Sequence, residues 1–137
     1  MKKLIVNVTG KQKNDKVDSI KMKALANSYE KNGLLYVIYK DSNLNEEQET
    51  TTMLKIAKDN ITLVRSGGVK QQQIFMQNKE SVSDYQTPYG LLKMMVKTHR
   101  LKIVLGTKST IEIDYSLYIN GSWQSDNELK ISMKPAN

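Results

Sequence analysis

The side chains that could perform acid–base or nucleophilic chemistry are few and stand far apart in this sequence. The single histidine, His99, lies in a lysine-rich stretch with no carboxylate near it in the chain. Nucleophilic catalysis needs a nucleophile, a base and an orienting group that converge in space. A histidine on the surface or at the rim of a barrel therefore explains His99 better than a catalytic role does. We predict no catalytic residues and expect a protein that is not an enzyme.

Paired carboxylates are the next candidates, because two of them can support glycoside hydrolysis. Glu46, Glu47 and Glu49 fall in a polar stretch, whereas Glu112 and Asp114 alternate with apolar residues and are expected to face water. The chain has no cysteine, which excludes disulfides, thiolate metal ligands and a cysteine nucleophile. With one histidine and no cysteine, a zinc site is not expected either. We therefore predict no metal site and no cofactor.

Arg65 is the residue that points most directly to ligand binding. If the alternation of Ile61 and Leu63 continues, the Arg65 side chain leaves its strand on the same face as the core. An inward guanidinium must find a partner, because burying an unpaired charge is unfavourable. One interpretation is a handle for a carboxylate or phosphate group at a barrel mouth. The other is a structural tether that binds strand ends or packs on an aromatic ring, and the sequence leaves both open.

Three more residues complete the candidate binding site. Tyr115 lies on a predicted inner face and Tyr89 flanks a predicted turn, so both could present hydroxyl donors, while Met94 would form an adaptable wall. The small residues Ala24 and Ala26 would leave room on the inner face. A barrel of about eight strands is either filled by side chains or just able to hold one small molecule. The sequence does not decide between these two states.

The elements that would position these residues are β-strands. Apolar and polar residues alternate most clearly over residues 111–119, and do so again at 4–9, 20–27 and 129–134. This period of two is typical of strands with one dry and one wet face. Helical alternatives exist for Glu46 to Lys58 and for the residues after Thr87, but their threonines and their alternation favour strands.

Tight turns separate the predicted strands. Asn32-Gly33 and Asn120-Gly121 are strong signals for two-residue hairpins, and Asp59-Asn60 occupies a similar place. Thr87-Pro88-Tyr89-Gly90 has the proline and glycine positions of a type I turn, and Asp41 to Thr52 is the expected long loop. Successive hairpins form a meander, which closes to remove its edges. We predict a single all-β domain over residues 1–137, an antiparallel up-and-down barrel of about eight to ten strands.

The charge pattern suggests a second kind of partner. The net charge is +7, yet only Arg65 and Arg100 among the 21 basic residues are arginines. Lysine lacks the planar fork that clamps phosphates, and alternating lysines are a common way to solvate the outer face of a sheet. Nucleic-acid binding through the outer wall stays open as an alternative, although no aromatic platforms interleaved with arginine support it.

The expected cellular compartment is inferred from three features that the sequence lacks: a membrane-spanning helix, a secretory signal and cysteines. Its apolar runs fall short of the roughly 18 residues that a membrane-spanning helix needs. The segment Met1 to Val6 is too short in its apolar part for a secretory signal and reads better as a first strand. Since there is also no cysteine for disulfides, a cytoplasmic protein is expected.

Three blocks of the sequence resemble a known family. They are residues 61–68 with Phe75, residues 85–90 leading into Met94, and residues 111–117 followed by 127–131. Together they resemble the bacterial YwiB-like family, a domain of unknown function with a calycin or lipocalin-like β-barrel. The resemblance implies a cup-shaped barrel and, by analogy, a small apolar ligand. It supplies no activity and no catalytic residues, since a fold does not determine a function.

These observations lead to one expected function and two alternatives. We expect non-enzymatic binding of a small, partly apolar ligand inside the barrel, with Arg65 available for an anionic group. Its expected contacts are Arg65, Tyr89, Met94 and Tyr115. The alternatives are RNA or ribonucleoprotein binding through the lysine-rich outer surface and, last, an enzyme.

Overall fold

The computed structural model describes residues 1–41, 50–67 and 70–136, and these residues form ten β-strands and no helix. No helix in this part of the chain is therefore long and apolar enough to cross a membrane. Both segments with a helical alternative contain a strand and no helix where they are described. The strands are β1 Lys2–Lys13, β2 Val17–Lys31, β3 Leu34–Asp41, β4 Thr50–Ile56, β5 Asn60–Ser66, β6 Gln71–Met76, β7 Glu80–Thr87, β8 Gly90–Val104, β9 Ser109–Ile119 and β10 Ser122–Pro135.

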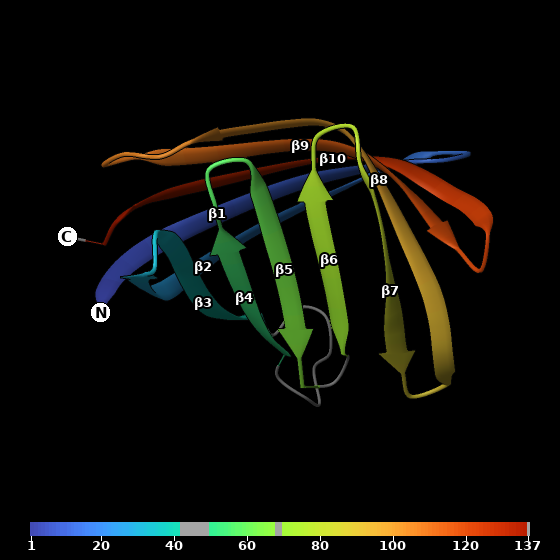
Figure 1. The fold of residues 1–137 in the computed structure, drawn as a ribbon, viewed down its shortest axis with the longest axis horizontal. Helices are drawn as coiled ribbons and strands as arrows, with labels where there is room; N and C mark the ends of the chain where they lie inside the picture. Colours follow the sequence, from blue (N-terminus) through green and yellow to red (C-terminus); the bar gives the residue numbers. More distant parts are fainter. Residues whose placement is uncertain (42–49, 68–69, 137) are drawn as a thin grey trace.

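The strands form one antiparallel sheet that closes on itself almost completely. Its order is β6-β5-β4-β3-β2-β1-β10-β9-β8-β7, so all consecutive strands except β6 and β7 pair with each other, and β1 joins β10 (Figure 1). The seam between β6 and β7 is fastened at one end by two backbone hydrogen bonds between Lys70 and Gln86, of 3.2 and 3.0 Å. At the other end, Asn78 and Lys79 pair with Thr98 of β8. The predicted up-and-down barrel is confirmed.

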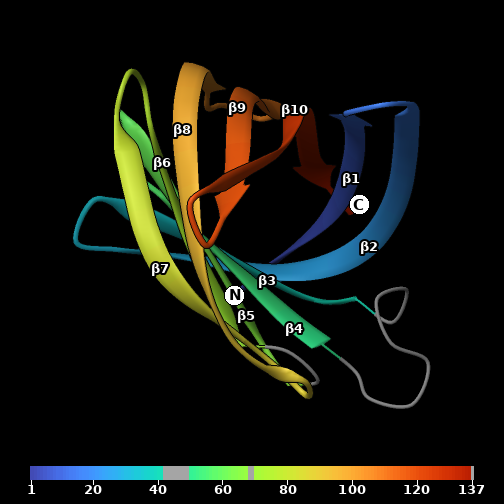
Figure 2. The ribbon, with the colours of Figure 1, turned by 90° about the vertical axis from the view of Figure 1, so that its right-hand side faces the viewer.

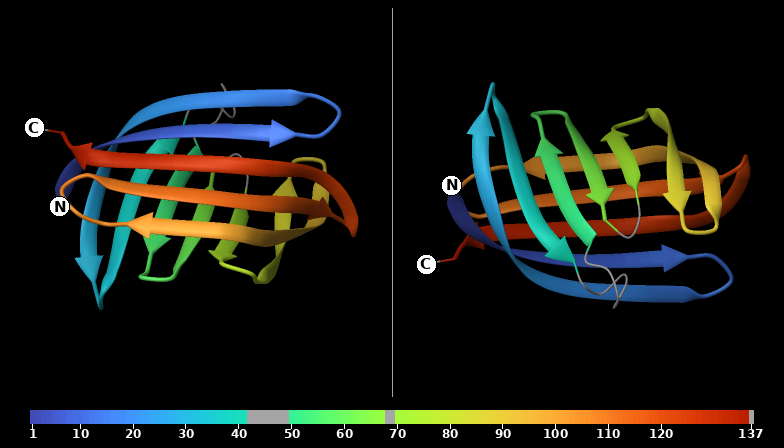
Figure 3. Two further views of the ribbon diagram at one scale, coloured as in Figure 1. Left: turned by 90° about the horizontal axis from the view of Figure 1, so that it is seen from above. Right: turned by 90° about the horizontal axis from the view of Figure 1, so that it is seen from below.

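The barrel is flattened into two layers of strands. The long strands β1, β8, β9 and β10 lie side by side in one layer, and β3 to β6 form the other (Figure 2). Seen from above and from below, the strands of the two layers cross at a steep angle, and β2 curves from one layer into the other (Figure 3). The inner faces of both layers meet in a common core, which is where period-two alternation must direct the apolar side chains.

The core contains many of the residues that the alternation predicted to be dry. Val6 of β1, Ile111 and Ile113 of β9 and Ile131 of β10 are buried as predicted, and Val37 of β3 and Leu54 of β4 are buried with them. Ile20, which belongs to the same phase of β2 as Met22, is nevertheless exposed. It lies toward the β1–β2 hairpin, where β2 contains no buried residue.

The turns have the backbone geometry that their sequences favour. Asn32 and Gly33 have φ of 54° and 78°, and Asn120 and Gly121 have φ of 50° and 84°, as a hairpin with two left-handed residues requires.

The predicted loop from Asp41 to Thr52 is wrong at its ends. Asp41 closes β3, and Thr50 and Thr52 are buried residues of β4 because β-branched threonines suit a strand. Residues 42–49, including Glu46, Glu47 and Glu49, lie outside the described residues.

Two irregularities interrupt the pairing of the last three strands. The register between β8 and β9 shifts between Thr98 and Arg100, and the register between β10 and β9 shifts between Trp123 and Ser125. An extra residue in one strand reverses the phase in which its side chains point inward. His99 is the extra residue in β8, so Thr98 faces the core while the following inward residue is Leu101.

Candidate ligand site inside the barrel

A row of polar side chains crosses the inner wall at one end of the barrel. Tyr39, Thr52, Arg65 and Gln71 are directly paired in turn across β3, β4, β5 and β6. They share the phase of the buried residues Val37, Leu54, Leu63 and Gln73 on the same strands, and so belong to the inner face. Arg65 thus points inward, as the alternation of β5 predicted.

The Arg65 guanidinium has one neutral partner. Its Nη1 donates a hydrogen bond of 3.2 Å to Oε1 of Gln71. The Nε2 amides of Gln71 and Gln73 both donate to Sδ of Met94 on β8, at 3.5 and 3.1 Å. A thioether sulfur is a weak acceptor. Two amide donors on one such sulfur are therefore poorly satisfied, and an oxygen acceptor between them would bind both more strongly.

Several buried polar atoms at this inner wall have no partner. Arg65 Nε and the hydroxyls of Thr50, Thr52 and Thr98 make no hydrogen bond. Thr52 is 0% exposed and Thr98 is 1% exposed, so bulk water does not satisfy them. Buried groups of this kind are rare in folded proteins and each one needs an explanation, such as a bound water, an ion or a functional role.

Tyr115 extends the polar wall from β9 on the opposite layer. It is paired with Thr98, and its ring lies against Phe75 of β6 with the centroids 4.9 Å apart. Burial raises the pKa of the Tyr115 hydroxyl, while the nearby charge of Arg65 acts in the opposite direction. Tyr115 therefore stays protonated at neutral pH and offers its proton as a hydrogen-bond donor.

We define the donor cluster as Thr52, Arg65, Gln71, Gln73 and Tyr115. Its only charge is the guanidinium, and no carboxylate among the described side chains forms an ion pair with Arg65. An arginine stays charged inside a protein, and among the described side chains its hydrogen-bond partner is the neutral amide of Gln71. A site with an excess of donors and a positive charge that pairs with no described carboxylate suits an anion. In the described part of the chain, no three histidine or acidic side chains are placed to hold a metal ion.

The structure brings three of the four predicted contact residues together. Arg65 and Tyr115 belong to the donor cluster, and Met94 borders it through its sulfur. Tyr89 does not, because it is 99% exposed in the turn between β7 and β8. In that turn the Thr87 hydroxyl accepts a hydrogen bond from the Tyr89 backbone N–H and donates one to the Gly90 carbonyl.

Other members of the cluster were not predicted from the sequence. Gln71 and Gln73 were overlooked although they share the phase of Phe75, and Thr52 was overlooked although it shares the phase of Leu54. Polar residues at inward positions of an alternating strand were the signal that could have identified them. Thr98 could have been identified in the same way, because it occupies the inward position that follows Met94 and Val96 on β8.

A second polar network lies on the outer face, directly behind Thr98 and Tyr115. The Ser116 hydroxyl donates to Oδ1 of Asp126 at 2.6 Å, and Nε2 of His99 lies 2.7 Å from the same Ser116 oxygen. The Trp123 indole N–H also donates to Oδ1 of Asp126, at 3.1 Å. The folded sheet therefore gives His99 a serine and, through it, a carboxylate, which the sequence neighbourhood did not suggest.

The hydrogen bonds of this network run in a different direction from those of a nucleophilic triad. An ionised carboxylate can only accept, so the single proton of Ser116 goes to Asp126 and His99 must donate through Nε2. In a triad the histidine instead accepts the proton of the serine. Ser116 is also buried. Since His99 and Trp123 belong to the two irregular regions of β8 and β10, the network ties these regions together across β9.

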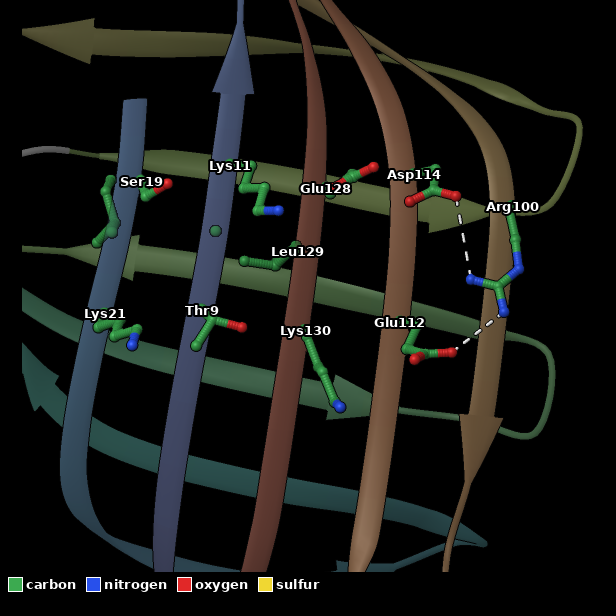
Figure 4. Close-up of a pocket in the computed structure, with 12 residues that line it drawn as sticks. Thr9, Lys11, Ser19, Lys21, Arg100, Glu112, Asp114, Glu128, Leu129 and Lys130 are labelled. Carbon is green, nitrogen blue, oxygen red and sulfur yellow. Dashed lines mark hydrogen bonds and ion pairs between the residues drawn. The ribbon is translucent and has the colours of Figure 1, made fainter. Parts of the chain in front are cut away.

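The outer wall carries mixed charges around a hollow over β1, β2, β8, β9 and β10 (Figure 4). Arg100 lies 3.1 Å from Glu112 and 4.0 Å from Asp114, and the two carboxylates face outward as predicted. Lys13 pairs with Glu128 in the same way, at 3.1 Å. Carboxylates thus interrupt the lysines of this wall, and exposed pairs of this kind contribute little stability.

The comparisons with known proteins place the chain in a family. A family described as "Domain of unknown function (DUF1934)" matches residues 5–131. The chain belongs to this family. The crystal structure of the ywiB protein from Bacillus subtilis has a TM-score of 0.89 to it at 19% identity, covering 99% of this chain and 93% of that one. The YwiB-like resemblance is confirmed, and at this identity the likeness concerns the fold. No curated protein matches the sequence, and the DUF1934 description carries no activity.

Proposed function

We propose that this DUF1934 protein is a non-enzymatic binding protein, whose ligand is small and carries an anionic group that pairs with Arg65 inside the barrel. The observation that carries the proposal is the set of inner-wall donors without good acceptors. Arg65 Nε and the Thr52 hydroxyl have no partner, and the Gln71 and Gln73 amides share one sulfur. A carboxylate or phosphate oxygen would supply the missing acceptor.

The energetic argument favours an anion over a water-filled or purely apolar site. A buried donor without a partner destabilises a protein by about 1–3 kcal/mol. Waters would satisfy the hydroxyls, but they would supply no counter-charge to a guanidinium that pairs with no described carboxylate. An apolar ligand would satisfy neither. Hydrogen bonds between a guanidinium and an oxyanion are about twice as strong as neutral ones, so an anion gains most at this place.

The alternative of nucleic-acid binding has less support. It requires a continuous positive surface, whereas Glu112, Asp114 and Glu128 lie among the basic residues of the outer hollow. A polyanion attracted by net charge alone would bind with a strong dependence on salt and without preference for a sequence. We therefore base the proposed function on the interior and treat polyanion binding as a control.

The first experiment is native mass spectrometry of the protein purified gently from its own host. A discrete added mass, lost when Arg65 is changed to Met, is the expected result. Arg65→Met is chosen because methionine keeps the unbranched apolar stem while removing the charge. A bare protein mass, together with no thermal stabilisation by any of a panel of small carboxylates and phosphates, would refute the proposal.

The matched control is Arg100→Met on the outer face. Arg100 is the other arginine of the chain and pairs with Glu112 and Asp114 in an exposed position. If the ligand binds the interior site, Arg100→Met retains the added mass and the stabilisation by anions. If both variants lose binding equally, general charge is responsible and the interior site is wrong.

A further inference from the structure

The arrangement of the inner wall also restricts the size and charge of the ligand. The paired residues of β3 to β6 form successive rows that change from polar to apolar along the barrel. The row of Tyr39, Thr52, Arg65 and Gln71 is followed by Val37, Leu54, Leu63 and Gln73, and then by Leu35, Ile56, Ile61 and Phe75. The donors therefore occupy two neighbouring rows. Residues two apart along a strand are separated by about 7 Å.

The interior beyond these two rows is filled by side chains. Ile56, Ile61 and Phe75 are among the largest fully buried residues, and Tyr115 packs on Phe75 from the opposite layer. Ile111, Ile113 and Ile131 complete the same core. A packed core of this kind has no space for an acyl chain unless several side chains move, which is unfavourable. The site is suited to a ligand that ends near Phe75.

The charge of the cluster limits the ligand as well. Arg65 supplies one positive charge, and the other donors in the cluster are neutral hydroxyls and amides. A second negative charge on the ligand would be buried without compensation, which is strongly unfavourable. The neutral donors of Thr52, Gln71, Gln73 and Tyr115 instead match uncharged oxygen atoms. A carboxylate alone offers only two oxygens to this set of five side chains.

We infer that the ligand is a compact monoanion, a short carboxylic acid that carries at least one additional oxo or hydroxyl oxygen. This inference rests on the proposed function and specifies its ligand. Its carboxylate would pair with Arg65 and Thr52, and its uncharged oxygen would replace the Met94 sulfur as the acceptor of the Gln71 and Gln73 amides. Long-chain fatty acids and dianions are excluded by the same geometry.

The test compares five probes on the full-length protein by calorimetric titration: propionate, lactate, pyruvate, succinate and octanoate. Lactate or pyruvate should bind at least tenfold more tightly than propionate, because only they offer the additional oxygen. Succinate and octanoate should bind more weakly than either. Equal binding of propionate would overturn the inference, and so would tighter binding of succinate or octanoate.

A pair of glutamine variants locates the selectivity in β6. Gln73→Leu should reduce the preference for pyruvate over propionate to less than threefold, because it removes an amide that meets the oxo group. Gln72→Leu is the matched control, since Gln72 is exposed on the other face of the same strand. Circular dichroism confirms that both variants are folded. An unchanged preference in Gln73→Leu would contradict the assignment.

The outcomes separate this inference from the proposed function. If octanoate or succinate binds best and Arg65→Met abolishes that binding, the interior anion site exists and the ligand class inferred here is wrong. If none of the five probes binds and the protein from its host carries no added mass, the proposed function fails as well.

Discussion

Thr52 and Arg65 occupy directly paired positions on β4 and β5, yet Thr52 Oγ1 and Arg65 Nε both lack a hydrogen-bond partner. Two neighbouring polar groups that leave each other unsatisfied are unfavourable for folding. Proteins keep local arrangements of this kind mainly where function requires them. The pair therefore marks the part of the inner wall where stability and binding oppose each other.

Replacing the Thr52 hydroxyl by a methyl group should raise the stability of the fold and weaken ligand binding. Thr52→Val keeps the shape and β-branching of the side chain but removes a buried, unpartnered polar group. We expect the free energy of unfolding to rise by about 1 kcal/mol, measured by urea denaturation. The same variant should bind a small carboxylate more weakly, because one donor is lost.

Thr51→Val is the control for this prediction, because Thr51 lies on the opposite face of the same strand and is only partly buried. Its unfolding free energy should stay within about 0.5 kcal/mol of the parent value. If Thr52→Val destabilises the protein instead, the Thr52 hydroxyl has a partner in solution and its place in the donor cluster must be given up.

The hairpin between β9 and β10 provides a test of the backbone. Gly121 has φ of 84°, and no heavy atom beyond its two chain neighbours lies within 4 Å of the place that a Cβ would take, so the conformation alone disfavours alanine there. Gly121→Ala should lower the unfolding free energy by about 1–2 kcal/mol. Gly106→Ala is the control, since its φ is ordinary and the nearest neighbour of its added Cβ would lie at 3.7 Å. A Gly121→Ala protein as stable as Gly106→Ala would contradict the assigned turn.

The outer network makes stability depend on pH in a defined direction. Hydrogen bonds from Ser116 and then Trp123 hold the pKa of Asp126 below its ordinary value. Desolvation opposes them, and the charges of His99 and Lys13 lower the pKa by less. A carboxyl with a lowered pKa stabilises the fold above its unfolded value of about 4, and the contribution disappears as pH falls through the folded value.

Ser116→Ala should therefore be less stable than the parent at neutral pH, and the difference should shrink below about pH 4. Urea titrations at neutral and acidic pH measure it, and the fluorescence of Trp123, the single tryptophan, reports the site directly. Asp126→Asn is the control, because it cannot titrate. A difference between Ser116→Ala and the parent that stays constant over this pH range would show that Asp126 is not the responsible group.

The sequence predicted the barrel well because period-two alternation is a local property. Ile111 and Ile113 were expected to be buried, and the Asn-Gly turns were expected to be left-handed, from adjacent residues alone. The networks were harder to predict. His99, Ser116 and Asp126 meet only because β8, β9 and β10 are neighbours and the register shifts beside Thr98 and Trp123. The position of such irregularities is not encoded in a simple alternation.

The inner wall illustrates the same limit. The inward direction of Arg65 followed from Ile61 and Leu63 on its own strand, but its contact with Gln71 depends on the register between β5 and β6. Tyr89 was expected to join the site as a hydroxyl donor beside a predicted turn. It lies in a hairpin turn instead, where a tight reversal leaves the side chain in solvent.

The electrostatic link between Arg65 and Tyr115 gives a last prediction, which does not depend on knowing the ligand. Burial raises the pKa of Tyr115 and the positive charge of Arg65 partly counteracts that rise, because it stabilises the tyrosinate. Arg65→Met should therefore raise the pKa of Tyr115 further, as followed by an NMR titration of labelled tyrosines in which Tyr115→Phe identifies the signal. Arg100→Met should leave the pKa of Tyr115 unchanged, since Arg100 pairs with Glu112 and Asp114 on the outer face. An unchanged or lower pKa in Arg65→Met would mean that the guanidinium does not face the interior beside Tyr115, and the candidate site would lose its only charge.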